Sequence, residues 1–318
     1  MTRTIPLMIT RFLPLLSLVA FSFASAGTVQ LVVPTYDYTP GNASNTEGTG
    51  IANNGTSVGQ YNHTATYGSF TRSKKGRFSR PILFPGANVT NAMGINISGL
   101  VCGSFEVTVP GMPRNKSRTG SPSRPENIIV THGFFFDGFT YTQFDLPGSD
   151  NTYVTGVNDA GDFCGYGSTM DGFNTGFVSI GGVITTFSGP AGVTISPLAI
   201  NNLGQVVGYY NTPTNAHGFF RAADGALTNP IDYPNALYTT LTGINDAGLI
   251  VGWYRSIGFV TSGMVVQNFN RFTSYDHPDA TNNTTIFFGV NNSSLISGYY
   301  QVDASGSGNH AFIARFGR

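Results

Sequence analysis

A twelve-residue pattern recurs six times along the chain and limits what the chain can fold into. Its clearest copy is GINDAGLIVGWY, at residues 243–254. The intervals between successive copies are 44, 62, 43, 44 and 46 residues. A period in this range is typical of repeat architectures, so each copy is expected to build one structural unit. The copies align on one glycine near the end of each, and these are Gly59, Gly103, Gly165, Gly208, Gly252 and Gly298.

The pattern predicts a β-hairpin. Ile244 is followed by Asn-Asp-Ala-Gly and then by a second apolar run. Asn and Asp favour turns because they bond to their own backbone two residues on, and Gly248 can adopt a positive φ without a steric cost. A type I turn closed by a left-handed residue fits this spacing. Ala52 replaces the usual Asn in the first copy, and Ser294 replaces the turn glycine in the last, as terminal repeats often depart from the pattern.

Two further strand signals accompany each hairpin. One is a Gly-Phe or Ala-Phe pair, often after a histidine, near His132, Gly176, His217, Gly258 and His310. The other is a β-rich run that ends in an aspartate shortly before a proline, at Asp37, Asp145, Asp232 and Asp276. Each unit therefore has four short strands, which is typical of a propeller blade. The predicted fold is all-β, a six-bladed β-propeller of four-stranded blades.

The two ends of the chain favour closure into a ring. After the leader, the chain begins with a lone strand, VQLVVPTYDYTPG, at residues 29–41, and it ends after the strand HAFIARF, at residues 310–316. The N-terminal strand can therefore supply the missing outer strand of the last blade. A closed ring leaves no long exposed sheet edge.

These motifs resemble the HAF family of extracellular repeats, which occurs in secreted bacterial proteins. The resemblance rests on G-[IV]-N-x-x-G-x-[IV]-V-G-x-Y followed by H-G-F, and it covers residues 28–316. It implies a secreted, propeller-like repeat protein. It implies no activity and no catalytic residues.

The first 26 residues read as a secretory signal peptide. Arg3 and Arg11 precede a short apolar core, and Ala24-Ser25-Ala26 forms an A-x-A cleavage site. The mature chain, residues 27–318, is expected to be one exported domain without a membrane span, and a monomer. Without Arg3 and Arg11 it has 14 basic and 16 acidic residues, and this balance favours neither a nucleic acid nor a membrane surface as partner.

Two segments hold nine of those 14 basic residues. One is TRSKKGRFSR, at residues 71–80; the other is a loop insertion at about residues 108–128, rich in Pro, Ser and Gly. They are interpreted either as solvated loops or as a site for an anionic partner such as an acidic polysaccharide. The candidate binding residues are Arg114, Lys116, Arg118, Arg124, Lys74, Lys75 and Arg77.

The other polar residues have structural explanations. The four aspartates before proline are expected to cap their own turns, and Asp159 and Asp246 to form the hairpin turns. Cys102 and Cys164 are expected to be small buried side chains without a disulfide. No zinc-protease, nucleophile-elbow, calcium-loop or phosphate-loop motif is present, so no cofactor and no metal are predicted.

Three functions remain open for such a scaffold. The first is a non-catalytic binding module, with sugars stacking on some of Tyr209, Tyr210, Trp253 and Tyr254, although packing between blades is the expected role of most of them. The second is a hydrolase or lyase at the mouth of the central channel. The third is a structural component of an envelope or matrix. Acids outside the repeat pattern that could serve an enzyme are Glu106, Asp150, Asp162 and Asp171.

Overall fold

The computed structural model describes residues 27–38, 45–63, 66–110, 127–281, 284–302 and 308–317. These residues form 23 β-strands and one short 3-10 turn, η1 (Pro190–Gly192). None of their helical segments is long and apolar enough to cross a membrane. The predicted leader, residues 1–26, lies outside the described residues.

Hydrogen bonds divide the strands into four sheets. The first contains β2 (Asn45–Ile51), β3 (Ser57–His63), β4 (Thr66–Arg72), β5 (Val89–Ile95), β6 (Val101–Pro110), β7 (Asn127–Phe136) and β8 (Tyr141–Phe144). The second contains β9 (Asn151–Val157), β10 (Phe163–Ser168), β11 (Asn174–Ile180) and β12 (Val183–Phe187).

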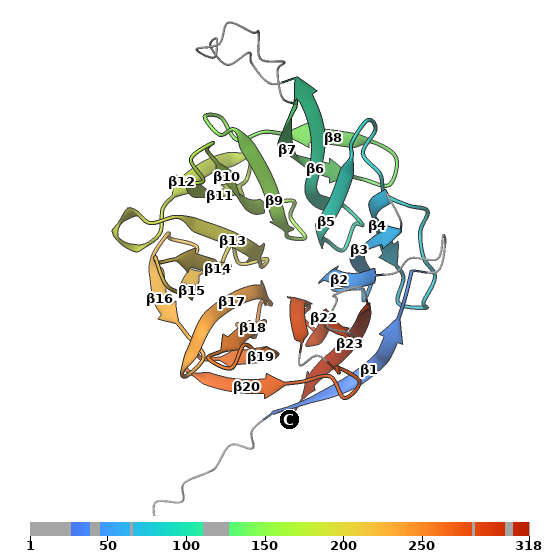
Figure 1. Ribbon diagram of the computed structural model, residues 1–318, viewed down its shortest axis with the longest axis vertical. Coiled ribbons are helices and arrows are strands. Elements are labelled where there is room, and N and C mark those ends of the chain that lie inside the picture. Colours follow the sequence, from blue (N-terminus) through green and yellow to red (C-terminus); the bar gives the residue numbers. More distant parts are fainter. Residues whose placement is uncertain are drawn as a thin grey trace, which may run out of the picture.

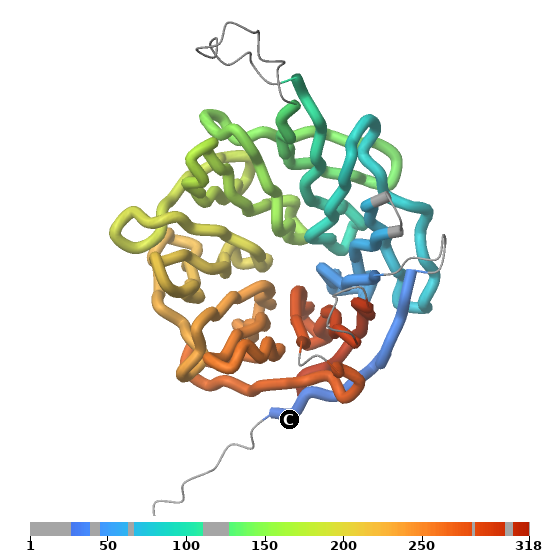
Figure 2. Tube along the Cα trace, viewed as in Figure 1, coloured from blue at the N-terminus to red at the C-terminus, as the bar shows by residue number. Residues whose placement is uncertain are grey.

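The remaining strands form the other two sheets. The third contains β13 (Ile195–Ile200), β14 (Val206–Asn211), β15 (Ala216–Arg221), β16 (Leu227–Ile231), β17 (Ala236–Ile244), β18 (Ile250–Ser256), β19 (Thr261–Gln267) and β20 (Arg271–Tyr275). The fourth contains β21 (Thr285–Val290), β22 (Leu295–Gln301), β23 (Asn309–Gly317) and β1 (Thr28–Tyr36). The sheets are arranged in a ring about a central axis (Figure 1), and the chain passes once around it (Figure 2). The fold is all-β and propeller-like.

The hairpin turns have the geometry that the pattern predicts. The side-chain oxygen of Asn245 accepts hydrogen bonds from the backbone N–H groups of Ala247 and Leu249. The N–H of Gly248 donates to the carbonyl of Asn245, and φ at Gly248 is +75°. Ser294, at the same place in the last copy, has φ +57°. Both residues are therefore left-handed, a conformation that strains any residue with a β-carbon.

Exchanging the two turn residues is expected to change stability in opposite directions. Gly248→Ala should cost about 1 kcal/mol, because open space surrounds the added methyl group and only the backbone strain opposes it. Ser294→Gly should stabilise the protein by up to about 1 kcal/mol, because relief of the strain outweighs the extra entropy of glycine in the unfolded chain. Thermal or urea unfolding of the two variants measures both effects. Equal midpoints for the two would contradict the turn assignment.

The anchoring positions require glycine because the backbone of the neighbouring strand approaches them closely. Each innermost strand has a register shift opposite its anchoring glycine, for example between Leu241 and Gly243 in β17. The shift directs a carbonyl oxygen at the glycine of the next strand. A β-carbon at Gly252 would lie 2.0 Å from the carbonyl oxygen of Thr240. No residue larger than glycine fits such a position without a backbone movement.

The two ends of the chain meet in the fourth sheet, as predicted. Strand β1 pairs with β23 in antiparallel register, from Thr28 opposite Gly317 to Tyr36 opposite Ala311. The first and last repeats also touch near the axis, because a β-carbon at Gly289 would lie 3.0 Å from Gly50 Cα. The amide nitrogen of Asn291 donates to the carbonyl of Ala52 at 2.9 Å.

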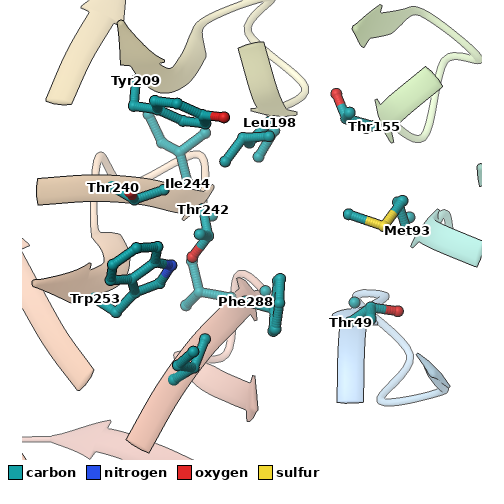
Figure 3. A pocket seen from close by; sticks show the side chains of 18 of the residues that line it. Thr49, Met93, Thr155, Leu198, Tyr209, Thr240, Thr242, Ile244, Trp253 and Phe288 are labelled. Atoms are coloured by element: carbon teal, nitrogen blue, oxygen red, sulfur yellow. The ribbon is translucent and has the colours of Figure 1, made fainter. Parts of the chain in front are cut away.

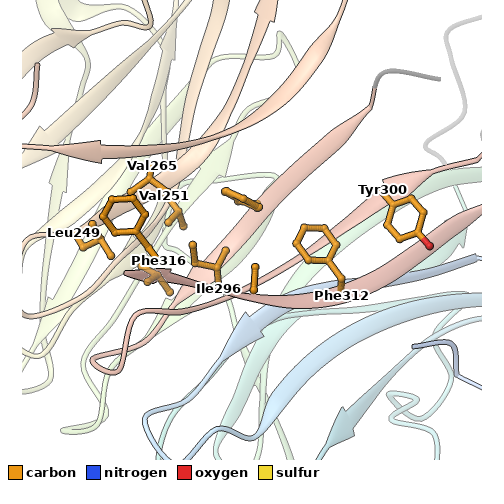
Figure 4. Close-up of a cluster of buried hydrophobic side chains, with 10 residues drawn as sticks. Leu249, Val251, Val265, Ile296, Tyr300, Phe312 and Phe316 are labelled. Atoms are coloured by element: carbon orange, nitrogen blue, oxygen red, sulfur yellow. The ribbon is translucent and has the colours of Figure 1, made fainter. Parts of the chain in front are cut away.

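The core lies between successive repeats. One cluster joins Leu249, Val251 and Val265, from β18 and β19 and the turn before them, to Ile296 and Phe312 of the following repeat (Figure 4). Cys102 and Cys164 are free and fully buried, which confirms their predicted structural role.

One predicted strand is wrong. Residues 258–260 form part of the turn between β18 and β19, and φ at Phe259 is +61°. The third strand of this repeat begins later, at Thr261, and Gly263 takes the position that Gly218 has in β15. The Gly-Phe signal failed here because a Gly-Phe pair in a turn and one in a strand look the same in the sequence.

Candidate functional site

A cavity of about 550 Å³ lies on the axis of the ring. Its wall comes mainly from the six innermost strands β2, β5, β9, β13, β17 and β21. Tyr209 and Trp253 lie on one side of it and Thr49, Met93 and Thr155 on the other (Figure 3). The axial strands thus enclose a space large enough for a small organic ligand.

Three consecutive residues of each innermost strand form three layers of this wall. The first layer is mixed and the second is a belt of small residues, where neighbouring strands approach closely. The third is aliphatic, and it also borders a smaller cavity of about 60 Å³ toward the hairpin turns. This aliphatic layer, which separates the two cavities, consists of Ile51, Ile95, Val157, Ile200, Ile244 and Val290.

A belt of amides and carboxylates surrounds the smaller cavity. The Asp159 carboxylate accepts hydrogen bonds from the Asn53 and Asn202 amides, at 2.7 and 3.1 Å. The Asp246 carboxylate accepts from the amides of Asn202 and Asn292, at 2.9 and 2.6 Å. Burial raises the pKa of Asp246, but hydrogen bonds from Asn202 and Asn292 lower it by more, so it lies below its ordinary value. Asp159 therefore connects the third repeat to the first and the fourth, and Asp246 connects the fifth to the fourth and the sixth, a role beyond the turn formation predicted for them.

The aromatic residues after the anchoring glycines divide into two groups. Tyr209, Trp253 and Tyr299 line the axial cavity. The residue that follows each of them points away from the cavity and packs against other parts of the protein. Tyr254 stacks on Tyr233 with ring centroids 3.5 Å apart, and Tyr210 is buried. The expected packing role is confirmed for Tyr210 and Tyr254, whereas Tyr209 and Trp253 face the cavity.

A polar pocket of about 150 Å³ contains Glu47, an acid that the sequence analysis did not single out. Its carboxylate accepts a hydrogen bond of 2.6 Å from the Asn309 amide. Burial raises the pKa of Glu47, and the hydrogen bond from Asn309 lowers it by less. A signal was present, because Glu47 is a charged residue on a strand that leads directly into the glycine-rich axial motif. The pocket is lined by Asn45, Glu47, Gln60, Tyr61, Asn62, Tyr67 and Asn91.

The turn caps predicted for the four aspartates before proline are not found at Asp145 and Asp232, and the turn after Asp37 lies partly outside the described residues. Three of them pair with histidines of the adjacent strand: Asp145 with His132 at 2.7 Å, Asp232 with His217 at 2.7 Å, and Asp37 with His310 at 2.9 Å. The backbone after each is held instead by a threonine hydroxyl; for Tyr233 the acceptor is Thr239, at 3.1 Å. The histidine of one strand signal and the aspartate of the other thus form a single contact in these three repeats. None of these histidines lines either axial cavity.

The four acids considered for catalysis are not brought together. Asp162 accepts from the N–H of Gly181 and the Asn158 amide, and Asp150 accepts from the N–H of Met170. Asp171 accepts from the Thr169 hydroxyl, and Glu106 lies on β6. None of the four lines the axial cavity. Within the described ranges no group of three or more His, Cys, Asp and Glu side chains could hold a metal ion.

The candidate basic residues fall into two sets. Arg114, Lys116, Arg118 and Arg124 lie outside the described residues. Lys74, Lys75 and Arg77 are exposed in a tight turn after β4, in which the N–H of Gly76 donates to the carbonyl of Ser73. The register places this turn at the opposite end of the strands from Pro110 and Asn127, which flank the other set.

No protein-family model matches the chain, and no relative was found among curated proteins. Among solved structures it is similar to a putative TolB from Agrobacterium tumefaciens, with 13% identity, a TM-score of 0.51 and coverage of 86% of this chain and 90% of that one. It is also similar to a mutant of AofleA from Arthrobotrys oligospora, with 12% identity, a TM-score of 0.51 and coverage of 92% and 86%. These neighbours are propeller-like, and at such identities they show the fold alone.

Proposed function

We propose that this protein is a secreted binding module that takes an extracellular glycan into its axial cavity. The observation that carries the proposal is the position of Tyr209, Trp253 and Tyr299, three aromatic side chains on the wall of one cavity. Aromatic faces are suitable platforms for sugar rings, because they combine a large apolar contact area with few rotatable bonds. Thr49, Thr155 and Thr242 line the same cavity, and their hydroxyl groups donate to backbone carbonyls of the next repeat, which fixes the wall.

The proposal assumes six blades closed into a ring of HAF-like repeats. Two of the sheets contain two repeats each, and a single parallel pair joins the repeats: Tyr67 with Val89 in one sheet and Ala216 with Tyr238 in the other. Dividing both sheets there yields six units. In the first unit the fourth strand is reduced to bridges from Ser69 to Ile82 and from Arg72 to Phe78.

The chain contains one tryptophan, so Trp253 reports on the cavity by itself. Oligosaccharide binding to the mature protein should shift its fluorescence. Tyr209→Ala should weaken binding about 5- to 10-fold, as expected from the loss of one aromatic contact of about 1–1.5 kcal/mol. Phe139→Ala, at a side chain that is 94% exposed in the turn between β7 and β8, is the matched control and should not change the affinity. Binding that ignores Tyr209, or no binding in a broad neutral glycan panel, would overturn the proposal.

The basic residues remain a separate prediction. If Arg114, Lys116, Arg118, Arg124, Lys74, Lys75 and Arg77 bind an acidic polysaccharide, its affinity should fall with salt, because exposed charges are screened. An acidic glycan at two salt concentrations in the same titration distinguishes this contact from binding in the cavity. The hydrolase or lyase hypothesis is tested in the same samples by analysis for cleaved glycan. The envelope hypothesis is tested by cell fractionation, which shows whether the protein remains with the envelope.

A further inference from the structure

The polar pocket around Glu47 adjoins the aromatic cavity. The Gln60 amide, in the polar pocket, donates to the sulfur of Met93 at 3.3 Å, and Met93 lines the cavity. Tyr299 connects the two from the other side: it lines the cavity, and the nearby charge of Glu47 adds to the burial that raises its pKa. The axial cavity and the polar pocket are therefore neighbours, although no residue lines both of them.

Glu47 and Asn309 bring acceptor oxygens together beside the polar pocket. Among the described residues, its carboxylate accepts a side-chain hydrogen bond from the Asn309 amide. The side-chain oxygen of Asn309, a residue only 6% exposed, has no hydrogen-bond partner in the structure. A buried acceptor without a donor is costly to the fold, and of these two residues Glu47 lines the polar pocket, so its carboxylate can accept from a donor that arrives with a ligand.

The charge balance selects the kind of donor. No Lys or Arg is found among the residues lining the axial cavity or the polar pocket. Every ion pair recorded between described residues uses a histidine, and none includes Glu47. A half-buried carboxylate without a cation, close to Tyr299, attracts positive charge by ion pairing, and the aromatic ring adds a cation–π contact.

We propose that Glu47 binds a protonated amino group of the ligand, so that the preferred glycan carries free amino sugars. The proposal rests on the axial binding site proposed above. In it the sugar rings stack on the aromatic wall, and one ammonium group donates hydrogen bonds to the Glu47 carboxylate. An N-acetylated sugar of the same skeleton lacks this charge.

The test compares a tetramer of glucosamine with a tetramer of N-acetylglucosamine, by calorimetry and by Trp253 fluorescence at neutral pH. The wild type should bind the glucosamine tetramer at least about tenfold more tightly, the range of a charged hydrogen bond of about 1.5–3 kcal/mol. Glu47→Gln keeps the acceptor for Asn309 and should abolish this preference. Glu106→Gln removes the same charge away from both cavities and should retain it.

Measuring stability and binding of the same variant separates a binding role of Glu47 from a purely structural one. A purely structural role would change stability and leave binding of the amine unaltered. Since its pKa is raised in the fold, ionisation opposes folding, and the protein loses stability as the pH rises through that pKa. Glu47→Gln should therefore raise the melting temperature at pH 7 and make no difference below about pH 4, while it weakens binding of the amine. The other ionisable groups that line the pocket, or that interact with Glu47, are the phenols of Tyr61, Tyr67 and Tyr299.

Each outcome decides between the two proposals. If both tetramers shift Trp253 fluorescence with equal affinity, the amine preference is wrong and the axial site stands. If neither tetramer binds, the amine site at Glu47 is overturned, and the neutral panel alone decides the axial site. A Glu47→Gln variant that binds the glucosamine tetramer as tightly as the wild type also overturns the role of Glu47.

Discussion

Gly252→Ala is expected to destabilise the protein by about 3 kcal/mol or more. The added methyl carbon would lie 2.0 Å from the carbonyl oxygen of Thr240 and 3.0 Å from Leu241 Cα. Both neighbours are backbone atoms in a paired strand, so no side-chain rotation can make room. Overpacking in a tight core costs typically 1–3 kcal/mol, and relief here requires the register shift in β17 to be removed.

Thermal unfolding measures this effect against two other glycines. Gly248→Ala adds a methyl group into open space and meets only backbone strain, so it should cost about 1 kcal/mol. At Gly258 the nearest atom is the Ser256 hydroxyl oxygen, 3.8 Å away, and φ lies outside the left-handed region, so Gly258→Ala should be nearly neutral. The melting temperature is expected to be highest for Gly258→Ala, lower for Gly248→Ala and lowest for Gly252→Ala. A Gly252→Ala variant as stable as Gly258→Ala would show that the strand can relax and that the close approach is unimportant.

Repetition made much of the fold predictable from the sequence. The turn at Asn245 and Gly248 could be read from local chemistry, because Asx turns and positive φ depend on residues close in sequence. Pairing of β1 with β23 could be predicted because the last repeat lacks an outer strand and the N-terminal segment is a single strand without a repeat of its own. The length of each repeat and its alternation of turns and apolar runs indicated four strands.

Contacts between residues that are far apart in the sequence were not predicted. Asp232 was assigned to its own turn, whereas its carboxylate pairs with His217 on the adjacent strand, 15 residues earlier. Asp246 was assigned to a turn, and it bonds to Asn202 and Asn292 of the flanking repeats. Nothing in the local sequence distinguishes a carboxylate that caps a turn from one that reaches across to a neighbour.

The candidate site was harder to predict for the same reason. Alternation along β18 shows that Trp253 and Tyr254 face opposite ways, but not which of them faces the axis. Glu47 was overlooked because it belongs to no motif, and its significance comes from Asn309, 262 residues away. A site on the axis of a ring takes one or two residues from each unit, so no single stretch of sequence reveals it.

A variant that lacks residues 27–38 is expected to lose cooperative folding. The deletion removes the whole of β1 together with Tyr36 and Tyr38, which are 7% and 0% exposed. Tyr38 stacks on Tyr61 and on Phe70, with centroids 4.5 and 4.9 Å apart, and so joins the last sheet to the first. Truncating one buried aromatic side chain costs about 3–5 kcal/mol, and the total stability of a domain is about 5–15 kcal/mol.

The loss extends beyond these two side chains. Without β1 the strand β23 becomes an exposed edge, a template for aggregation, and the carbonyl of Pro34 no longer accepts from the buried His277. Circular dichroism and size-exclusion chromatography should therefore show a broad, low-temperature transition and association. Val32→Ser, at a side chain of the same strand that is 50% exposed, is the control and should unfold like the wild type.

Complementation distinguishes a missing strand from a generally damaged chain. A synthetic peptide of residues 28–38 should pair with β23 and restore a cooperative transition, because an extended peptide can add to an open sheet edge through main-chain hydrogen bonds. The same peptide with Tyr36 and Tyr38 replaced by Ser should restore much less, since the hydrogen bonds remain and the buried rings are lost. If the truncated protein melts cooperatively within a few degrees of the full chain, β1 is dispensable. The ring is then held by the remaining contacts between the first and last repeats, among them the hydrogen bonds from Asn291 to Ala52, from Asn292 to Asn53 and from Asn309 to Glu47.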